Sequence, residues 1–215
     1  ARRWVGAEGW GWRGGRGGGG EGVGGVAGAG RADHRHEGRD RREQAFGAML
    51  GGRPGPAILE MAPDRLAAFE EVAVRESPSE NQAPDPEEAL IKQAAARLKA
   101  ARCPAILVGG GTLSATGPLR QLAEQLQAPV ISTISARGVL SDDHPLSYTV
   151  LAGQHIWEHV DVALVVGTRF TAPALSWGRL GEMDVVRIDI DPDAVSRPVG
   201  SSVEIVTSAD KGLSA

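Results

Sequence analysis

A short apolar run that ends in glycines constrains the fold of this chain most. The run PAILV occupies residues 104–108, and three consecutive glycines follow at 109–111. Helical patterns flank it over residues 87–102 and 116–127. A strand that is apolar on both faces and lies between helices is typical of a parallel α/β sheet. Glycines at its carboxyl end let the backbone approach a ligand closely, at the edge where open α/β sheets bind ligands.

The rest of the C-terminal region repeats this plan. Further short apolar runs lie at 130–132, 162–166, 185–190 and 203–206, separated by helical or irregular stretches. Alternating strands and helices imply right-handed crossovers and parallel pairing. We therefore predict a Rossmann-like α/β fold for residues 87–215, with a parallel sheet of five or six strands flanked by helices.

The N-terminal residues 1–40 have a different character, since they consist largely of glycine, arginine and tryptophan without helical or strand periodicity. Such a segment cannot bury enough surface to fold, so we predict a disordered Gly/Arg-rich tail. It could bind single-stranded nucleic acid. It could also be a frameshift product of GC-rich DNA, which we favour because only three of the 23 basic residues are lysines.

Two short elements and a connector link this tail to the sheet domain. Residues 41–50 have a helical pattern and residues 57–61 a strand pattern, which together are too little for a domain. We interpret residues 41–64 as the end of a preceding domain. Residues 65–86 are acidic and rich in proline, as expected of a linker. Asp85 and Pro86 predict the start of the next helix.

Composition excludes several classes of partner. The formal net charge of -4 gives no argument for nucleic-acid binding, and no apolar run approaches the roughly 20 residues that cross a bilayer. The single cysteine, Cys103, rules out an internal disulfide and fits a cytoplasmic location. We expect its side chain to be buried beside the first strand.

Several motifs, taken in order, resemble the thiamine diphosphate-dependent enzymes of the acetolactate synthase and benzoylformate decarboxylase type. They are RPGPAILEMAPD (53–64), PAILVGGG (104–111), APVISTISARGVLSDDHPLSYTV (128–150), DVALVVGTRF (161–170) and VVRIDIDPDAV (185–195). The resemblance covers residues 41–215. It implies that residues 41–64 end a pyrimidine-binding domain and that residues 87–215 form the central domain.

The resemblance also implies an activity. Intact members of the family bind thiamine diphosphate and Mg²⁺, decarboxylate a small 2-oxo acid such as pyruvate, transfer the resulting acyl carbanion equivalent, and form homo-oligomers. Some hold FAD or ADP in the central domain. The family's catalytic glutamate and its GDG…N motif have no recognisable equivalent here, so we predict no catalytic residue, no metal ligand and no activity of this chain alone. The alternative is a non-catalytic nucleotide-binding (FAD or ADP) or structural module.

The candidate cofactor-binding residues follow from the ends of the predicted strands and from the resemblance. They are Gly109, Gly110, Gly111, Thr133, Gly167, Thr168, Arg169, Asp189, Asp191 and Asp210. Backbone amides of a glycine turn can bind phosphate, and an acid at a strand end can accept hydrogen bonds from ribose. The resemblance places Arg169 along the dinucleotide.

Several of these candidates also have a structural alternative. The three glycines could form a tight turn without a ligand. Arg169 could form an ion pair with Asp189 or Asp191, and Asp210 could cap the last helix.

Overall fold

The computed structural model describes residues 45–58, 83–178 and 181–215. The chain divides into two compact units, residues 1–82 and 83–215. In the first unit, residues 45–50 form a helix within the predicted segment 41–50. The predicted tail lies outside the described residues, as does most of the predicted strand 57–61.

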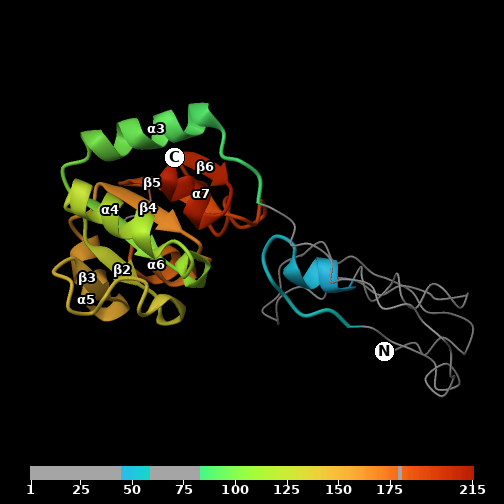
Figure 1. Cartoon of the computed structure of the whole chain (residues 1–215). Coiled ribbons are helices and arrows are strands. Elements are labelled where there is room, and N and C mark those ends of the chain that lie inside the picture. Colours follow the sequence, from blue (N-terminus) through green and yellow to red (C-terminus); the bar gives the residue numbers. More distant parts are fainter. Residues whose placement is uncertain (1–44, 59–82, 179–180) are drawn as a thin grey trace, which may run out of the picture. The chain divides into compact units, whose positions relative to one another are not determined.

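The second unit is built on one six-stranded sheet, which confirms the predicted fold class (Figure 1). Its strands are β1 (Pro104–Val108), β2 (Val130–Ser132), β3 (Ser147–Thr149), β4 (Val162–Val166), β5 (Asp184–Asp189) and β6 (Val203–Val206). They lie in the order β3-β2-β1-β4-β5-β6, and every neighbouring pair is parallel. This is the strand order of a dinucleotide-binding fold.

Helices cover both faces of the sheet (Figure 1). They are α3 (Glu88–Ala100), α4 (Thr116–Leu126), α5 (Val150–Trp157), α6 (Thr171–Ser176) and α7 (Ala209–Ser214), with short 3₁₀ turns η1 (Gly110–Thr112) and η2 (Ile134–Ala136). Side chains of α3, α4 and α7 pack on one face with Ile106 and Leu164. On the other face, Trp157 of α5 and Phe170 before α6 pack with Leu107 and Val165.

The centre of the sheet explains the apolar runs in the sequence. β4 lies between β1 and β5, and all five of its residues are buried. Alternate residues of β1 and β4 belong to different cores, because successive side chains point to opposite faces. A strand covered on both faces needs apolar residues at every position rather than at every second one.

Some local predictions were wrong. The sequence suggests irregular stretches over residues 133–154 and 168–183, yet strand β3 and helix α6 lie within them. Neither element has a recognisable period, because β3 has only three residues and α6 contains Pro173. The sequence also suggests a short helix that starts at Pro192, but the segment after Asp191 forms turns.

Two predicted positions at the start of the domain also differ. Helix α3 begins at Glu88 rather than next to Asp85, whose carboxylate instead accepts a hydrogen bond from Lys211 Nζ at 2.6 Å. Cys103 is exposed, because it lies in the turn before β1 and not in the strand itself.

In the part of the chain that the structure describes, every helix is too short or too polar to cross a membrane.

Candidate functional site

The residues that follow the carboxyl ends of the strands define one edge of the sheet, because all six strands run the same way. Every candidate named from the sequence lies at this edge. The glycines 109–111 follow β1, Thr133 follows β2, Gly167 to Arg169 follow β4, Asp189 and Asp191 lie at the end of β5, and Asp210 lies in α7 after β6.

The strand order reverses between β1 and β4. From β1 the chain moves outward to β2 and β3, and it then returns to the other side of β1 to form β4. The loops after β1 and β4 therefore begin at neighbouring strand ends, and open α/β sheets bind their ligands at such a switch point. The sequence places glycines in both loops.

Two of these glycines are needed for packing between the loops. The amide of Gly109 donates to the carbonyl of Val166 at 3.0 Å, and the amide of Gly111 donates to that of Gly167 at 3.1 Å. A Cβ on Gly109 would lie 2.3 Å from the carbonyl oxygen of Gly167 and 2.5 Å from Cβ of Thr168. The tight-turn interpretation therefore accounts for Gly109 and Gly111, and both of their amides are already engaged.

Gly110 and Gly111 are both exposed, but Gly110 differs from its two neighbours because it has room for a side chain. A Cβ there would meet only Ser135 of η2, at 3.4 Å. Next to this position, Thr133 is half-buried, and its amide donates to the carbonyl of Val108 at 3.0 Å. Within the described residues the hydroxyl of Ser132 is buried without a hydrogen-bond partner. Sequence reasoning did not select Ser132, since a serine at a strand end carries no specific signal.

Arg169 is exposed just after β4. Its guanidinium forms no ion pair with any described residue, so the pair with Asp189 or Asp191 does not form. Those two carboxylates accept hydrogen bonds from nearby amides instead: Asp189 from that of Asp191 at 3.1 Å, and Asp191 from that of Asp193 at 2.9 Å. Arg169 is therefore an exposed cation just after β4, without an ion-pair partner among the described residues.

Asp210 lies at the far side of the sheet, because β6 is an edge strand. It is exposed in the first turn of α7, and it does not cap that helix. The cap is Ser208, whose side chain accepts a hydrogen bond from the amide of Lys211 at 3.4 Å.

Other polar clusters do not form a metal site. His155 and His159 are exposed, and Asp142 forms an ion pair with Arg137 at 2.6 Å. Among residues 45–58, 83–178 and 181–215, no three His, Cys, Asp or Glu side chains are placed to hold a metal ion.

The turn that contains His144 has a structural role. His144 Nε2 lies 3.1 Å from Glu124 Oε1, and its Nδ1 accepts a hydrogen bond from the amide of Leu146 at 3.2 Å. Hydrogen bonds from Arg120 and from His144 lower the pKa of Glu124. These contacts attach the turn to α4.

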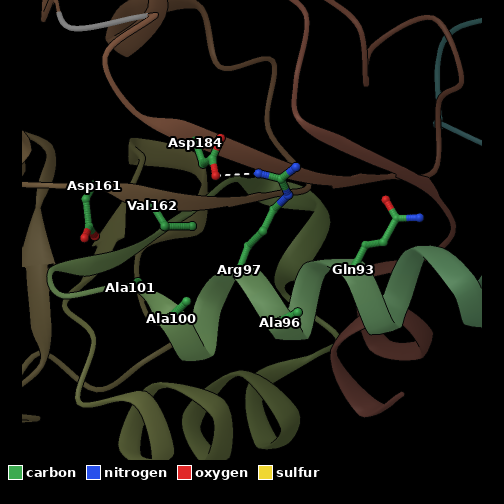
Figure 2. A pocket seen from close by; sticks show the side chains of 8 residues that line it. All are labelled: Gln93, Ala96, Arg97, Ala100, Ala101, Asp161, Val162 and Asp184. Atoms are coloured by element: carbon green, nitrogen blue, oxygen red, sulfur yellow. Dashed lines mark hydrogen bonds and ion pairs between the residues drawn. The ribbon is translucent and has the colours of Figure 1, made fainter.

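A groove of about 580 Å³ lies at the opposite, amino edge of the sheet, between α3 and the starts of β4 and β5 (Figure 2). Figure 2 shows Arg97 of α3 reaching across to Asp184, and the distance from Arg97 Nη1 to Asp184 Oδ2 is 2.5 Å. Gln93 lies further along the same helix. Since these two charges are paired with each other, neither is a free charge for a ligand.

The third charge beside this groove, Asp161, is engaged by the backbone. Its carboxylate accepts hydrogen bonds from the amides of Arg102 at 2.7 Å and Cys103 at 3.0 Å. Burial acts to raise the pKa of Asp161, but these hydrogen bonds outweigh it and the pKa is lowered. Asp161 therefore stabilises the turn between α3 and β1, and the carboxyl edge remains the better candidate for a ligand.

Three kinds of hydrogen-bond donor lie at the carboxyl edge. They are the exposed Gly110, the unpartnered buried hydroxyl of Ser132 and the exposed guanidinium of Arg169. Amides, hydroxyls and guanidinium groups are the donors that bind phosphate oxygens. A parallel sheet of this strand order, with glycine loops at its switch point, defines an α/β domain of the dinucleotide-binding type.

Comparison with known proteins identifies the family. The model of the thiamine pyrophosphate enzyme central domain matches residues 91–215, and the chain belongs to this family. It is 32% identical over 181 residues to the acetolactate synthase isozyme 1 large subunit of Escherichia coli, which covers 79% of this chain and 32% of the relative. It is also 32% identical to a Pseudomonas aeruginosa protein described as a probable 2-ketoarginine decarboxylase, covering 80% of this chain and 32% of that protein.

Solved structures have the same fold. A Mycobacterium smegmatis enzyme described as thiamin diphosphate-dependent superposes with a TM-score of 0.64 and 25% identity, over 81% of this chain and 36% of that one. Benzoylformate decarboxylase from Polynucleobacter necessarius superposes with a TM-score of 0.63 over 80% of this chain and 34% of that one, and its 22% identity supports the fold alone. The chain spans about a third of the length of the curated relatives it matches.

Proposed function

We propose that this chain is part of a thiamine diphosphate-dependent 2-oxo acid decarboxylase or carboligase of the acetolactate synthase type, located in the cytoplasm. In this proposal residues 87–215 are its central domain, residues 65–86 a linker, and residues 41–64 the end of its pyrimidine-binding domain. The family match over residues 91–215 and the names of the relatives support this assignment.

The contribution of the central domain itself would be to bind a nucleotide, FAD or ADP, at the carboxyl edge of the sheet. The observation that carries this proposal is the exposed guanidinium of Arg169, which has no ion-pair partner among the described residues and follows β4 at the switch point. An unpaired arginine beside a glycine turn suits a diphosphate. Gly110, Thr133 and Thr168 would line the same site.

The reaction itself would need groups that this chain does not provide. Thiamine diphosphate supplies the carbanion chemistry when bound, and in this proposal it and Mg²⁺ are held by other domains of a homo-oligomeric enzyme. The small 2-oxo acid substrate would bind there as well. We therefore expect the chain alone not to release CO₂ from pyruvate when thiamine diphosphate and Mg²⁺ are supplied.

The proposal is tested by titrating the purified 215-residue chain separately with ADP and with FAD, using calorimetry for ADP and flavin fluorescence for FAD. We expect one of them to bind, and Arg169→Ala to weaken binding about tenfold, the effect of losing one charge-assisted hydrogen bond. The matched control is Arg102→Ala, which removes an exposed arginine at the opposite edge of the sheet and should leave affinity unchanged. Equal effects of the two variants would contradict the site, since binding would then follow overall charge.

A second candidate function is a structural module without a ligand. It is favoured by Gly109 and Gly111, whose amides are both engaged within the protein. If neither ADP nor FAD binds the wild-type chain, the structural module becomes the better interpretation.

A further inference from the structure

A buried arginine inside the sheet contacts the loops at the carboxyl edge. Arg187 lies in the middle of β5, and its side chain is completely buried, with 0% exposure. It is paired in register with Val165 of β4 and Glu204 of β6. A buried guanidinium is costly unless its donors are satisfied, so its position in a central strand calls for specific contacts.

Those contacts reach two different loops. Nη2 of Arg187 donates to the carbonyl of Thr168 at 2.7 Å, and Nη1 donates to the carbonyl of Arg197. The guanidinium carbon lies 5.5 Å from the centre of the Phe170 ring, a distance at which a cation–π interaction is favourable. Nε has no hydrogen-bond partner within the described residues.

The electrostatic environment keeps this residue charged. Burial lowers the pKa of Arg187, while the carboxylates of Asp189 and Glu204 act to raise it. Because arginine does not lose its proton in proteins, the guanidinium remains a cation at all relevant pH values. Its five donors and planar shape allow it to bind two carbonyls at once, which lysine cannot reproduce.

The contacts of Arg187 fix the residues on both sides of Arg169. Thr168 is held by its carbonyl and Phe170 by its ring, while the side chain between them is exposed. Phe170 has φ of 58°, in the left-handed region that non-glycine residues rarely adopt. Such a conformation is strained and persists where surrounding contacts determine it. The Phe170 ring also packs on Trp157, with centroids 5.9 Å apart.

We propose that Arg187 is a positioning residue, which holds the segment Thr168–Phe170 so that Arg169 points to an anionic group at the switch point. The proposal rests on the proposed function only for the nature of that group, the diphosphate of a nucleotide. If Arg187 served the stability of the sheet alone, its loss would not act through Arg169.

A double-mutant cycle separates these two roles. The variants are Arg187→Met, Arg169→Ala and the combination of both, with ADP or FAD affinity as the readout. We expect each single variant to weaken binding about tenfold, and the combination to bind no more weakly than Arg169→Ala alone. The proposal would be overturned if the two single losses of affinity multiplied in the combined variant, or if Arg187→Met left the affinity unchanged. Arg187→Lys should be intermediate, and it replaces Arg187→Met in the cycle if the methionine variant does not fold.

A second measurement does not depend on a nucleotide. Amide hydrogen exchange in peptides that cover residues 167–177 should become faster in Arg187→Met and less so in Arg187→Lys, while peptides that cover β1 and β2 should stay unchanged. Unchanged exchange over 167–177 would overturn the proposal. If the wild-type chain binds neither ADP nor FAD but exchange responds as expected, the proposed function fails while the positioning of this segment by Arg187 stands.

Discussion

The contact between the two glycine loops makes a quantitative prediction for Gly109→Ala. The added Cβ would lie 2.3, 2.5 and 2.7 Å from atoms of Gly167 and Thr168, two of which belong to the backbone. Favourable carbon contacts lie at about 3.5–4.0 Å, so one of the loops has to move by roughly an ångström. This displacement strains the packing by about 1–3 kcal/mol. It also breaks the hydrogen bonds from Gly109 and Gly111 to the β4 loop, each worth about 1 kcal/mol.

We therefore expect Gly109→Ala to lower the free energy of unfolding by about 4 kcal/mol. The assay is urea unfolding of the full chain, followed by tryptophan fluorescence, with Trp157 as a fully buried reporter in this domain. The control is Gly110→Ala, whose nearest contact would be 3.4 Å from Ser135 and which should change stability by less than about 0.5 kcal/mol. A loss below about 1 kcal/mol for Gly109→Ala, or equal losses for both variants, would refute the packing argument.

Two further predictions concern stability. Both Gly117 of α4 and Gly153 of α5 lie in helices, yet alanine should change the stability of the protein in opposite directions at the two positions. Nothing lies within 4 Å of a Cβ on Gly117, so the higher helix propensity of alanine should stabilise the protein by about 0.5–1 kcal/mol. A Cβ on Gly153 would lie 2.4 Å from Cγ2 of Ile131, so Gly153→Ala should destabilise it by about 1–2 kcal/mol. Thermal unfolding of the two variants decides this, and shifts of the same sign would count against it. The pKa of Asp161 is lowered in the folded protein, so its ionised carboxylate stabilises the fold. This stabilisation should be complete above the pKa of the unfolded state, near 4, and should be lost as the pH falls through the lower pKa of the folded state. Asp161→Asn should flatten the stability profile below about pH 4, and an unchanged acid dependence would assign the effect to other carboxylates.

Much of the fold follows from local sequence patterns. The apolar runs at β1 and β4 predict strands buried on both faces, and the flanking helical periods predict crossovers between parallel strands. The position of the candidate site follows as well, because the carboxyl ends of parallel strands share one edge. Strand β3 and helix α6 could not be predicted. Three residues are too few to show the alternation of a strand, and a helix that contains Pro173 gives no clear helical period.

The assignment of individual residues at the edge depended on contacts that no local pattern encodes. The sequence presents three equivalent glycines, whereas the tertiary structure packs Gly109 and Gly111 against Gly167 and leaves room for a side chain at Gly110. It also presents Arg169 as a partner for nearby acids, while the structure leaves its guanidinium without an ion pair among the described residues.

The sequence by itself determined the class of sheet and the family resemblance, and it predicted the edge at which a ligand would bind. Hydrophobic periodicity and glycine placement are local properties, so they can be recognised without a structure. Only the tertiary structure decided that Arg187, which occupies an ordinary strand position in the sequence, is a buried cation bonded to two loops. The physical reason is that hydrogen bonds and burial depend on strand register and loop geometry, which bring together residues that are distant in the chain.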